Sequence, residues 1–352
     1  MGRWSVTEKG KLAIFGGTPV RGKDNPLPDV FPRKIADSAL TYIREVIDSG
    51  FTSDMEARFQ RAFAKACGVK HAVTVTNCTA AVHAALGALD LGPGDEVVVS
   101  PISDYGSVAG VIAQNAIPVF PDVDVRNGCV TAKEMEKVLT PKTRAMVVVH
   151  WYGLMCDMDP IMDLARDRNI VVVEDCCQNP LGDYKGRKAG SMGDMGCFSF
   201  DAEKHLSAEH GGAVVTNSEE LANKVRKFAL LRGAENVPRY GRKHTGFGLN
   251  YRFGSLLSAV ALAQLEILPQ QNKRRVELAQ ILNEKLEEMD SLIPIYAPSG
   301  CSHLYWLYTL QLDLSRFKAG IWEIGDALKA EGIPCSPAPY YLLPDCVTFL
   351  SE

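Results

Sequence analysis

The chain has 352 residues, of which 46% are hydrophobic and 23% charged, with a formal net charge of −4 and a pI near 6.0. This is ordinary globular composition, and the length allows two domains of usual size. The balance argues against a nucleic-acid partner, no basic run indicates a membrane surface, and no apolar run approaches the ~18 residues of a spanning helix. The first residues, MGRWSVTEKGK, contain no apolar core of a secretory signal.

Residues 34–67 predict two helices, which end at Gly50 and Gly68, because glycine commonly ends a helix. From residue 71 onwards, short apolar runs rich in valine alternate with helical segments. The expected strands, in chain order, are HAVTVT, EVVVSP, IPVFPDVD, RAMVVVHWYG and IVVVEDCCQ. This alternation is typical of a mostly parallel sheet with helices on both faces.

The pattern changes after residue 196. GCFSF and GGAVVT are strand-like runs without a helix between them, which predicts an antiparallel pair. A long helical region begins at Gly254, and we expect Pro269 to break or kink it. The later runs YWLYTLQLDL and KAGIWEIGDALKAEGIP predict a smaller α+β domain.

The ten cysteines include no C-x-x-C pair, and several lie in apolar runs. Zinc sites usually contain such closely spaced pairs, so we favour buried reduced thiols over a metal site. Reduced thiols are typical of the cytoplasm, where we expect the protein to act.

Ligands of open parallel sheets bind beyond the carboxyl ends of the strands, so the residues there are candidates for a site. At TNCTAAV a strand turns into a helix whose first N–H groups could bind a phosphate, or which is merely capped by Asn77 or Thr79. Asp175 ends a buried run and needs a cation or hydrogen-bond donors, although a structural ion pair would also suffice. Tyr105 is a core residue or a ring for stacking. Lys204 follows GCFSF, where a surface hairpin is the alternative.

Together, these four features are what pyridoxal phosphate requires of a protein. A lysine binds its aldehyde covalently, a carboxylate keeps its ring nitrogen protonated, and a helix N-terminus holds its phosphate. The combination is less expected by chance than any one of its parts. The sequence therefore predicts a pyridoxal-phosphate site.

Several longer motifs occur in a fixed order, and the chain resembles the DegT/DnrJ/EryC1/StrS family of pyridoxal-phosphate-dependent sugar aminotransferases over roughly residues 27–340. The motifs that carry the resemblance are GVKHAVTVTNCTAAVHAAL, LGPGDEVVVSP, IPVFPDVD, VVVHWYG, VVVEDCCQ, YKGRKAGSMGDMGCFSF with its later lysine, GGAVVT and GLNYRFGSLLSAVALAQL. The resemblance implies a three-layer α/β fold, transferase fold type I, with a mostly parallel sheet in the large domain. The implied parts are an N-terminal arm, a large cofactor-binding domain and a small α+β C-terminal domain: 1–26, 27–255 and 256–352.

The resemblance also implies residue roles. Lys204 binds the cofactor and moves a proton between amino donor and cofactor, and Asp175 pairs with the ring nitrogen. Gln178 contacts the ring hydroxyl, and Tyr105 stacks on the ring. The residues implied at the phosphate are Cys78, Thr79 and Ser199.

Asn250 and Arg252, in GLNYR, match residues that in this family reach the phosphate region of a neighbouring subunit, with Arg252 also a candidate for substrate contact. The resemblance thus implies a homodimer with shared active sites.

The chain departs from the family at four places. Cys78 stands where the usual triplet Ser-Gly-Thr has glycine, so a side chain occupies a place of close backbone approach. His210 replaces a usual glutamate, which changes the charge near the substrate, and SGFTSD is shorter than the usual loop. The chain ends at PDCVTFLSE, where relatives continue, so we expect a natural short form or an incomplete small domain.

The expected function is transfer of an amino group from glutamate or glutamine to a keto group of a nucleotide-linked sugar or a cyclitol. One alternative is a family-type dehydratase, which has histidine at the lysine position and is kept open by His205 and His210. Another is a regulatory relative that binds the cofactor without turnover. A nicotinamide enzyme is disfavoured, because no strand is followed by G-x-G-x-x-G.

Overall fold

The computed structural model describes residues 11–31, 33–337 and 342–350. The chain forms two compact units. The larger unit contains Ile35–Ala279, Tyr296–Tyr308 and the described part of Tyr341–Glu352, and the smaller contains Gln280–Ile295 and the described parts of Met1–Lys34 and Thr309–Tyr340. The expected boundary between a large and a small domain after residue 255 differs from this division and stays a prediction.

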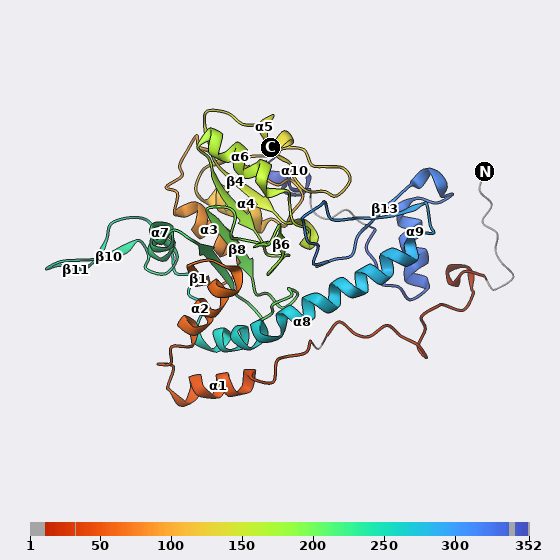
Figure 1. The fold of residues 1–352 in the computed structure, drawn as a ribbon, viewed down its shortest axis with the longest axis horizontal. Helices are drawn as coiled ribbons and strands as arrows, with labels where there is room; N and C mark the ends of the chain where they lie inside the picture. The colour runs from red at the N-terminus through yellow and green to blue at the C-terminus, as the bar shows by residue number, and fades with distance from the viewer. Residues whose placement is uncertain (1–10, 32, 338–341, 351–352) are drawn as a thin grey trace. The chain divides into compact units, whose positions relative to one another are not determined.

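A seven-stranded sheet forms the centre of the larger unit (Figure 1). In spatial order its strands are β1 (His71–Val75), β9 (Gly212–Thr216), β8 (Met195–Ser199), β5 (Val171–Asp175), β4 (Thr143–Val149), β2 (Glu96–Val99) and β3 (Ile117–Val119). Strand β9 runs antiparallel to β1 and β8, and all other neighbours are parallel. The predicted mostly parallel sheet and the antiparallel pair after residue 196 are both confirmed.

Helices cover both faces of this sheet. Cys197 of β8 packs into the same core as the alanines of α3, whereas its neighbour Phe198 lies with its ring centroid 5.0 Å from that of Phe63 in α2. Successive residues of a strand point to opposite faces, so α3 and α2 lie on opposite sides. Strands β2, β4 and β5 are buried on both faces, which explains their continuous valine runs, whereas the edge strand β3 is partly exposed.

The helices have the following bounds: α1 (Ala39–Asp48), α2 (Met55–Cys67), α3 (Cys78–Gly87), α4 (Gly106–Ala113), α5 (Ala132–Glu136), α6 (Met158–Arg168), α7 (Glu219–Ala229), α8 (Ser255–Leu286), α9 (Ile321–Ala330) and α10 (Leu343–Cys346). Short 3₁₀ turns cover Ala13–Phe15, Trp151–Gly153, Leu314–Arg316 and Thr348–Leu350. Gly68 follows α2 with a φ of 71°, a left-handed conformation that suits glycine, and so ends the helix as predicted. None of the helices in the described residues is long and apolar enough to cross a membrane.

Of the expected break or kink at Pro269, the break is wrong, because α8 runs unbroken for 32 residues with this proline inside; the kink stays a prediction. Proline removes one helical hydrogen bond and crowds the preceding turn. Packing compensates here, since Leu268 is fully buried and Asn272 donates a hydrogen bond to the Pro180 carbonyl over 3.0 Å. Tertiary contacts thus hold the helix together across its weakest position.

Within the described residues, three small antiparallel pairs complete the fold: β6 (Asp183–Tyr184) with β7 (Arg187–Lys188), β10 (Ala234–Val237) with β11 (Gly241–His244), and β12 (Leu292–Pro294) with β13 (Leu310–Leu312). The last pair and α9 belong to the smaller unit, where the α+β pattern was predicted. In that unit the Glu331 carboxylate accepts hydrogen bonds from the N–H groups of Ala13 and Val20, over 2.8 and 2.9 Å. These two donors lower the pKa of Glu331 and attach the N-terminal arm to the end of α9.

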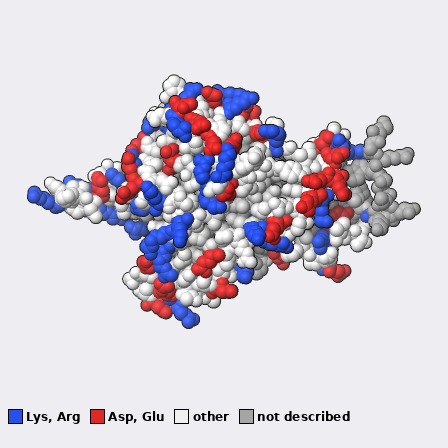
Figure 2. Space-filling view, viewed as in Figure 1, with Lys and Arg blue, Asp and Glu red and all other residues white. Residues whose placement is uncertain are grey.

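Acidic and basic side chains are interspersed over most of the face in Figure 2, in keeping with the small net charge of −4.

Candidate active site

Asp175 ends β5, and its carboxylate is only 2% exposed. Its Oδ2 accepts a hydrogen bond from Ser107 Oγ over 2.7 Å, and its Oδ1 accepts one from the Cys177 N–H over 3.1 Å. The Cys78 thiol also donates to Oδ1, with sulfur 3.8 Å away. Within the described parts of the chain these donors are all neutral, so the buried charge has no cation beside it.

Gln178 is fully buried, and the orientation of its amide follows from its partner. Its Oε1 accepts a hydrogen bond from the Tyr152 N–H over 2.6 Å, and a backbone N–H can only donate. The amide nitrogen Nε2 is therefore left as a donor, and it has no hydrogen-bond partner among residues 11–31, 33–337 and 342–350. Such a buried donor costs about 1–3 kcal/mol unless an acceptor meets it, as a bound ligand would.

Lys204 lies in the loop that follows β8, with its Nζ 3.7 Å from the centroid of the Trp306 ring. The charge of Lys204 acts on Cys177, two residues after Asp175. The pKa of Cys177 is raised overall. The hydrogen bond with Cys78 lowers this pKa, burial and the Asp175 charge together raise it by more, and the Lys204 ammonium lowers it. Lys204 therefore lies near Cys177, two residues after Asp175, and its pairing with Asp175 in one catalytic site stays a prediction.

A segment from much later in the chain covers this loop. The Trp306 indole N–H donates to the Glu203 carbonyl over 3.2 Å, and His205 Nε2 donates to the Leu304 carbonyl over 3.1 Å. The Trp306 backbone N–H also donates to the Tyr152 carbonyl over 2.8 Å, which links Lys204 to the neighbourhood of Gln178. Sequence reasoning missed Trp306, because no local pattern relates it to a lysine 102 positions before it.

The first turn of α3 lies beside the end of β8. Asn77 caps the helix, its Oδ1 accepting the Ala80 N–H over 2.8 Å, so the expected cap is present, which leaves the phosphate site as a prediction. The remaining N–H groups of the first turn have no partner within the helix. Ser199 pairs with Gly212, and a Cβ on Gly212 would lie 2.5 Å from the Asn77 carbonyl. Only glycine permits this approach, which places Ser199 close to the helix N-terminus.

Thr79 and Tyr105 lie on neighbouring helix starts. A Cβ on Gly106 would lie 2.6 Å from Thr79 Oγ1, so the starts of α3 and α4 are in close contact. Tyr105 is 43% exposed, and its ring meets that of Phe349 edge-on with centroids 6.3 Å apart. Its ring is thus accessible, although its role in stacking stays a prediction.

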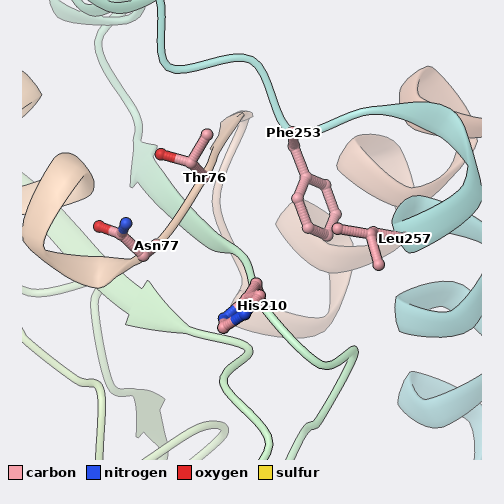
Figure 3. A pocket seen from close by; sticks show the side chains of 5 residues that line it. All are labelled: Thr76, Asn77, His210, Phe253 and Leu257. Atoms are coloured by element: carbon pink, nitrogen blue, oxygen red, sulfur yellow. The ribbon is translucent and has the colours of Figure 1, made fainter.

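A hollow of about 380 Å³ lies beside His210 and is lined by Thr76, Asn77, His210, Phe253 and Leu257 (Figure 3). The His210 side chain is exposed, with its Nδ1 3.9 Å from Asp201 Oδ2. The residue that departs from the family pattern therefore faces an open space next to the cap of α3.

Asn250 and Arg252 are exposed, and no contact joins them to Asp175 or Lys204 within the described chain. Between them, Tyr251 is anchored by a hydrogen bond from its N–H to the Ala229 carbonyl over 2.7 Å and by its hydroxyl, 2.9 Å from His83 Nδ1. This anchoring holds the backbone between the two exposed polar residues in place.

Cys78, Asp175 and Cys177 offer three ligand atoms within 4.8 Å of one another, as do His150, Glu174 and Cys176. A hydrogen bond with Cys177, burial and the Asp175 charge hold the pKa of the Cys78 thiol well above its usual range. Glu174 accepts hydrogen bonds from the backbone N–H groups of Gly190, Met192 and Gly193 and lies 3.0 Å from His150. The first cluster therefore surrounds Asp175 with neutral thiols, and the second is a hydrogen-bonded structural network.

The sequence model of the DegT/DnrJ/EryC1/StrS aminotransferase family matches residues 33–345. The chain belongs to this family. It is 35% identical over 328 residues to GDP-perosamine synthase of Caulobacter vibrioides, covering 91% of this chain and 87% of that protein. It is 35% identical over 348 residues to L-glutamine:2-deoxy-scyllo-inosose aminotransferase of Streptoalloteichus tenebrarius, covering 93% of this chain and 80% of that protein.

Among solved structures, the chain is similar to the aminotransferase TlmJ from Streptoalloteichus hindustanus, with a TM-score of 0.83 and 31% identity, covering 92% of this chain and 87% of that one. The predicted type I fold is thereby confirmed. As a family member, the chain is a pyridoxal-phosphate-dependent aminotransferase. The dehydratase and regulatory alternatives are not favoured.

The site residues fit pyridoxal phosphate. The unpaired Nε2 of Gln178 offers a donor to a ring hydroxyl, and Asp175 offers a buried negative charge to a protonated ring nitrogen. The first turn of α3, with Ser199 nearby, offers N–H groups to a phosphate. Sequence reasoning missed Ser107. This serine lies two residues after Tyr105 but donates a hydrogen bond to a carboxylate 68 positions away.

Proposed function

We propose that the enzyme moves an amino group from glutamate or glutamine to the keto group of a nucleotide-linked sugar or a cyclitol. The names of two relatives support these two substrate classes, since one makes a GDP-linked sugar and the other uses L-glutamine and an inosose. The observation that supports the catalytic part is the buried Asp175 carboxylate, which has only neutral donors within the described chain. It lies two residues before Cys177, whose pKa the Lys204 ammonium lowers.

Each site residue has a distinct task in this proposal. Bound pyridoxal phosphate supplies a ring that accepts electrons from a breaking Cα–H bond and stores the amino group. The Asp175 carboxylate keeps the proton on the ring nitrogen, and the Lys204 amine binds the cofactor and then carries the proton from the donor's Cα. The Gln178 Nε2 donor holds the ring hydroxyl, and Tyr105 stacks on the ring.

The remaining assignments concern the phosphate, the substrate and the assembly. We assign the phosphate to Ser199 and to the start of α3 at Cys78 and Thr79. His210 borders the keto substrate. Asn250 and Arg252 reach the active site of a second subunit in a homodimer, an assignment supported by their exposure and by the absence of side-chain partners for them among the described residues. The large cofactor-binding domain over 27–255, the small domain from 256 and the cytoplasmic location also belong to this proposal.

The experiment that tests the catalytic assignment is Lys204→Ala. We expect turnover to fall at least about a thousandfold, because one residue supplies both the covalent attachment and the proton carrier. The visible absorbance of the lysine-bound cofactor should disappear as well. Lys224→Ala is the control, since Lys224 lies on α7 with its Nζ 3.0 Å from Glu220 Oε1 and should keep full activity.

The substrate class is tested separately. The aminated cofactor form of the enzyme is mixed with a panel of keto-sugars, free and nucleotide-linked, and keto-cyclitols. Return of the visible absorbance of the lysine-bound cofactor identifies an acceptor. If none of the panel restores this absorbance, the proposed acceptor class is wrong.

A further inference from the structure

Two buried serines form a chain of hydroxyl groups that ends on Asp175. Ser103 Oγ lies 2.6 Å from Ser107 Oγ, and Ser107 Oγ lies 2.7 Å from Asp175 Oδ2. Their exposed fractions are 0% for Ser103 and 2% for Ser107. Water therefore does not compete for these hydrogen bonds, and their geometry is set by the protein.

The direction of the protons follows from the chemistry of the end group. An ionised carboxylate only accepts hydrogen bonds, so Ser107 donates its proton to Asp175. The hydrogen bond between the two serines must then use the proton of Ser103. Donation toward an anion polarises each hydroxyl in turn, so Ser103 strengthens the bond that Ser107 makes.

The number of donors also determines how many acceptor positions of the Asp175 carboxylate remain for a ligand. An ionised carboxylate has about four acceptor positions in its plane. The Cys177 N–H and the Cys78 thiol use Oδ1, and Ser107 uses one position on Oδ2. Within the described residues, one acceptor position is left, and it lies on the oxygen that Ser107 holds.

Ser107 lies in the first turn of α4, and hydrogen bonds hold the turn that precedes it. The Asp104 side chain accepts the Gly106 N–H over 2.9 Å, and the Ser107 N–H donates to the Asp104 carbonyl over 3.1 Å. These bonds form the turn that leads into the helix. Ser103 lies in the loop before α4, and its Oγ meets that of Ser107 in the first turn of the helix.

We propose that Ser107, supported by Ser103, is a positioning residue that orients Asp175 toward the ring nitrogen of the cofactor. This inference rests on the proposed pairing of Asp175 with that nitrogen. By fixing Oδ2, Ser107 keeps the remaining acceptor position in place.

The test measures the affinity of the cofactor-free enzyme for two ligands. One is pyridoxal phosphate, and the other is its 1-deaza analogue, in which carbon replaces the ring nitrogen. The dissociation constant of the analogue divided by that of pyridoxal phosphate reports the pairing with Asp175 alone, because all other contacts are shared. Ser107→Ala should lower this ratio about tenfold, the effect expected for one hydrogen bond to a charged group. A merely structural role would weaken both ligands equally and leave the ratio unchanged.

Three further variants make the result decisive. Ser107→Thr retains the hydroxyl and should keep the ratio near that of the unmodified enzyme. Ser103→Ala removes only the supporting donor and should lower the ratio about twofold, so it replaces Ser107→Ala if that variant does not fold. Ser258→Ala is the matched control, because Ser258 is a fully buried helix serine whose hydroxyl donates to the Gly254 carbonyl.

The outcomes separate this inference from the proposed function. If the unmodified enzyme binds both ligands equally, and Asp175→Asn changes nothing, the role proposed for Asp175 is wrong and this inference fails with it. If the unmodified enzyme discriminates, Asp175→Asn abolishes the discrimination, and Ser107→Ala leaves it intact or larger, only the positioning role of Ser107 is overturned.

Discussion

At the scale of single residues, unused hydrogen-bonding capacity distinguishes the site from the rest of the core. Most buried polar groups in proteins have partners, as Glu174 does with its three backbone donors. The Gln178 amide and the Asp175 carboxylate keep a donor and an acceptor position unused by the described residues. Both lie at or just beyond the end of one strand, β5. Their unmet capacity is the residue-level sign of a ligand site.

A buried histidine makes the stability of the enzyme depend on pH. Burial lowers the pKa of His303 from 6.5 to about 4. The unfolded chain therefore binds a proton at this residue between about pH 6.5 and pH 4, where the folded chain does not. Protonation of the unfolded state draws the equilibrium toward unfolding, so stability falls as the pH falls through this window.

We expect His303→Asn to be less sensitive to acid. The asparagine oxygen can replace His303 Nδ1, which accepts the Tyr305 N–H over 3.1 Å. Between pH 7 and pH 5 the free energy of unfolding should fall by about 2 kcal/mol less in the variant than in the unmodified enzyme. Urea titrations at the two pH values measure this difference. Equal losses in both proteins would show that His303 does not titrate as described.

At the scale of elements, the N-terminus of α3 combines two tasks that one residue can separate. Asn77 caps the helix through its side-chain oxygen, and the same turn is the proposed phosphate site. A cap requires an oxygen acceptor, whereas a phosphate site also requires the absence of negative charge. Substitutions at this one position therefore test both tasks.

Asn77→Asp should keep the cap but weaken cofactor binding. Aspartate caps helices as well as asparagine does, so we expect the free energy of unfolding of the cofactor-free protein to change by less than about 0.5 kcal/mol. Its charge should repel the phosphate and lower the affinity for pyridoxal phosphate about tenfold, an effect that weakens with added salt. Denaturant titration and cofactor titration give the two values.

Asn77→Ala is the matched control, since it removes the cap without adding charge. It should lower the free energy of unfolding by about 1 kcal/mol. If Asn77→Asp binds the cofactor as tightly as the unmodified enzyme does, the phosphate lies elsewhere.

The helix α8 shows where element-level reasoning fails. The proline rule predicts an interruption at Pro269, and the rule is sound for a helix in isolation. Here, Leu268 and Asn272 are buried on either side of the proline, and their packing outweighs the lost hydrogen bond. Gly50 and Gly68, which follow helices, and Asn77, which caps the start of one, predicted helix boundaries better, because their effect is local.

At the scale of the whole molecule, the proposed sharing of active sites between subunits can be tested by mixing two inactive variants. Lys204→Ala lacks the catalytic amine, and Arg252→Ala lacks the residue proposed to reach the neighbouring subunit. In a hybrid dimer, one of the two sites has both residues intact. After unfolding and refolding an equal mixture, we expect roughly a quarter of the unmodified activity, because half of the dimers are hybrids with one complete site each.

As a control, each variant is unfolded and refolded by itself, and both samples should stay inactive. Recovery no greater than the sum of the separate samples would show that Arg252 acts within its own subunit or not at all.

The sequence by itself determined what depends on neighbours along the chain. Valine runs, glycine stops and the change of rhythm after residue 196 predicted the strands and the antiparallel pair, and the ordered motifs predicted the family and the cofactor. These signals are readable because strand and helix periodicity arise within a few residues. They also placed Lys204 and Asp175 at strand ends, which a parallel sheet brings to one edge.

Only the tertiary structure decided which side chains touch. The hydrogen bond from Ser107 to Asp175 joins residues 68 positions apart, and the one from Trp306 to Glu203 joins residues 103 apart. Neither contact has a pattern in the sequence, because packing depends on shape and distance in three dimensions. The unbroken helix at Pro269 has the same cause, since buried neighbours supplied what the local rule does not include.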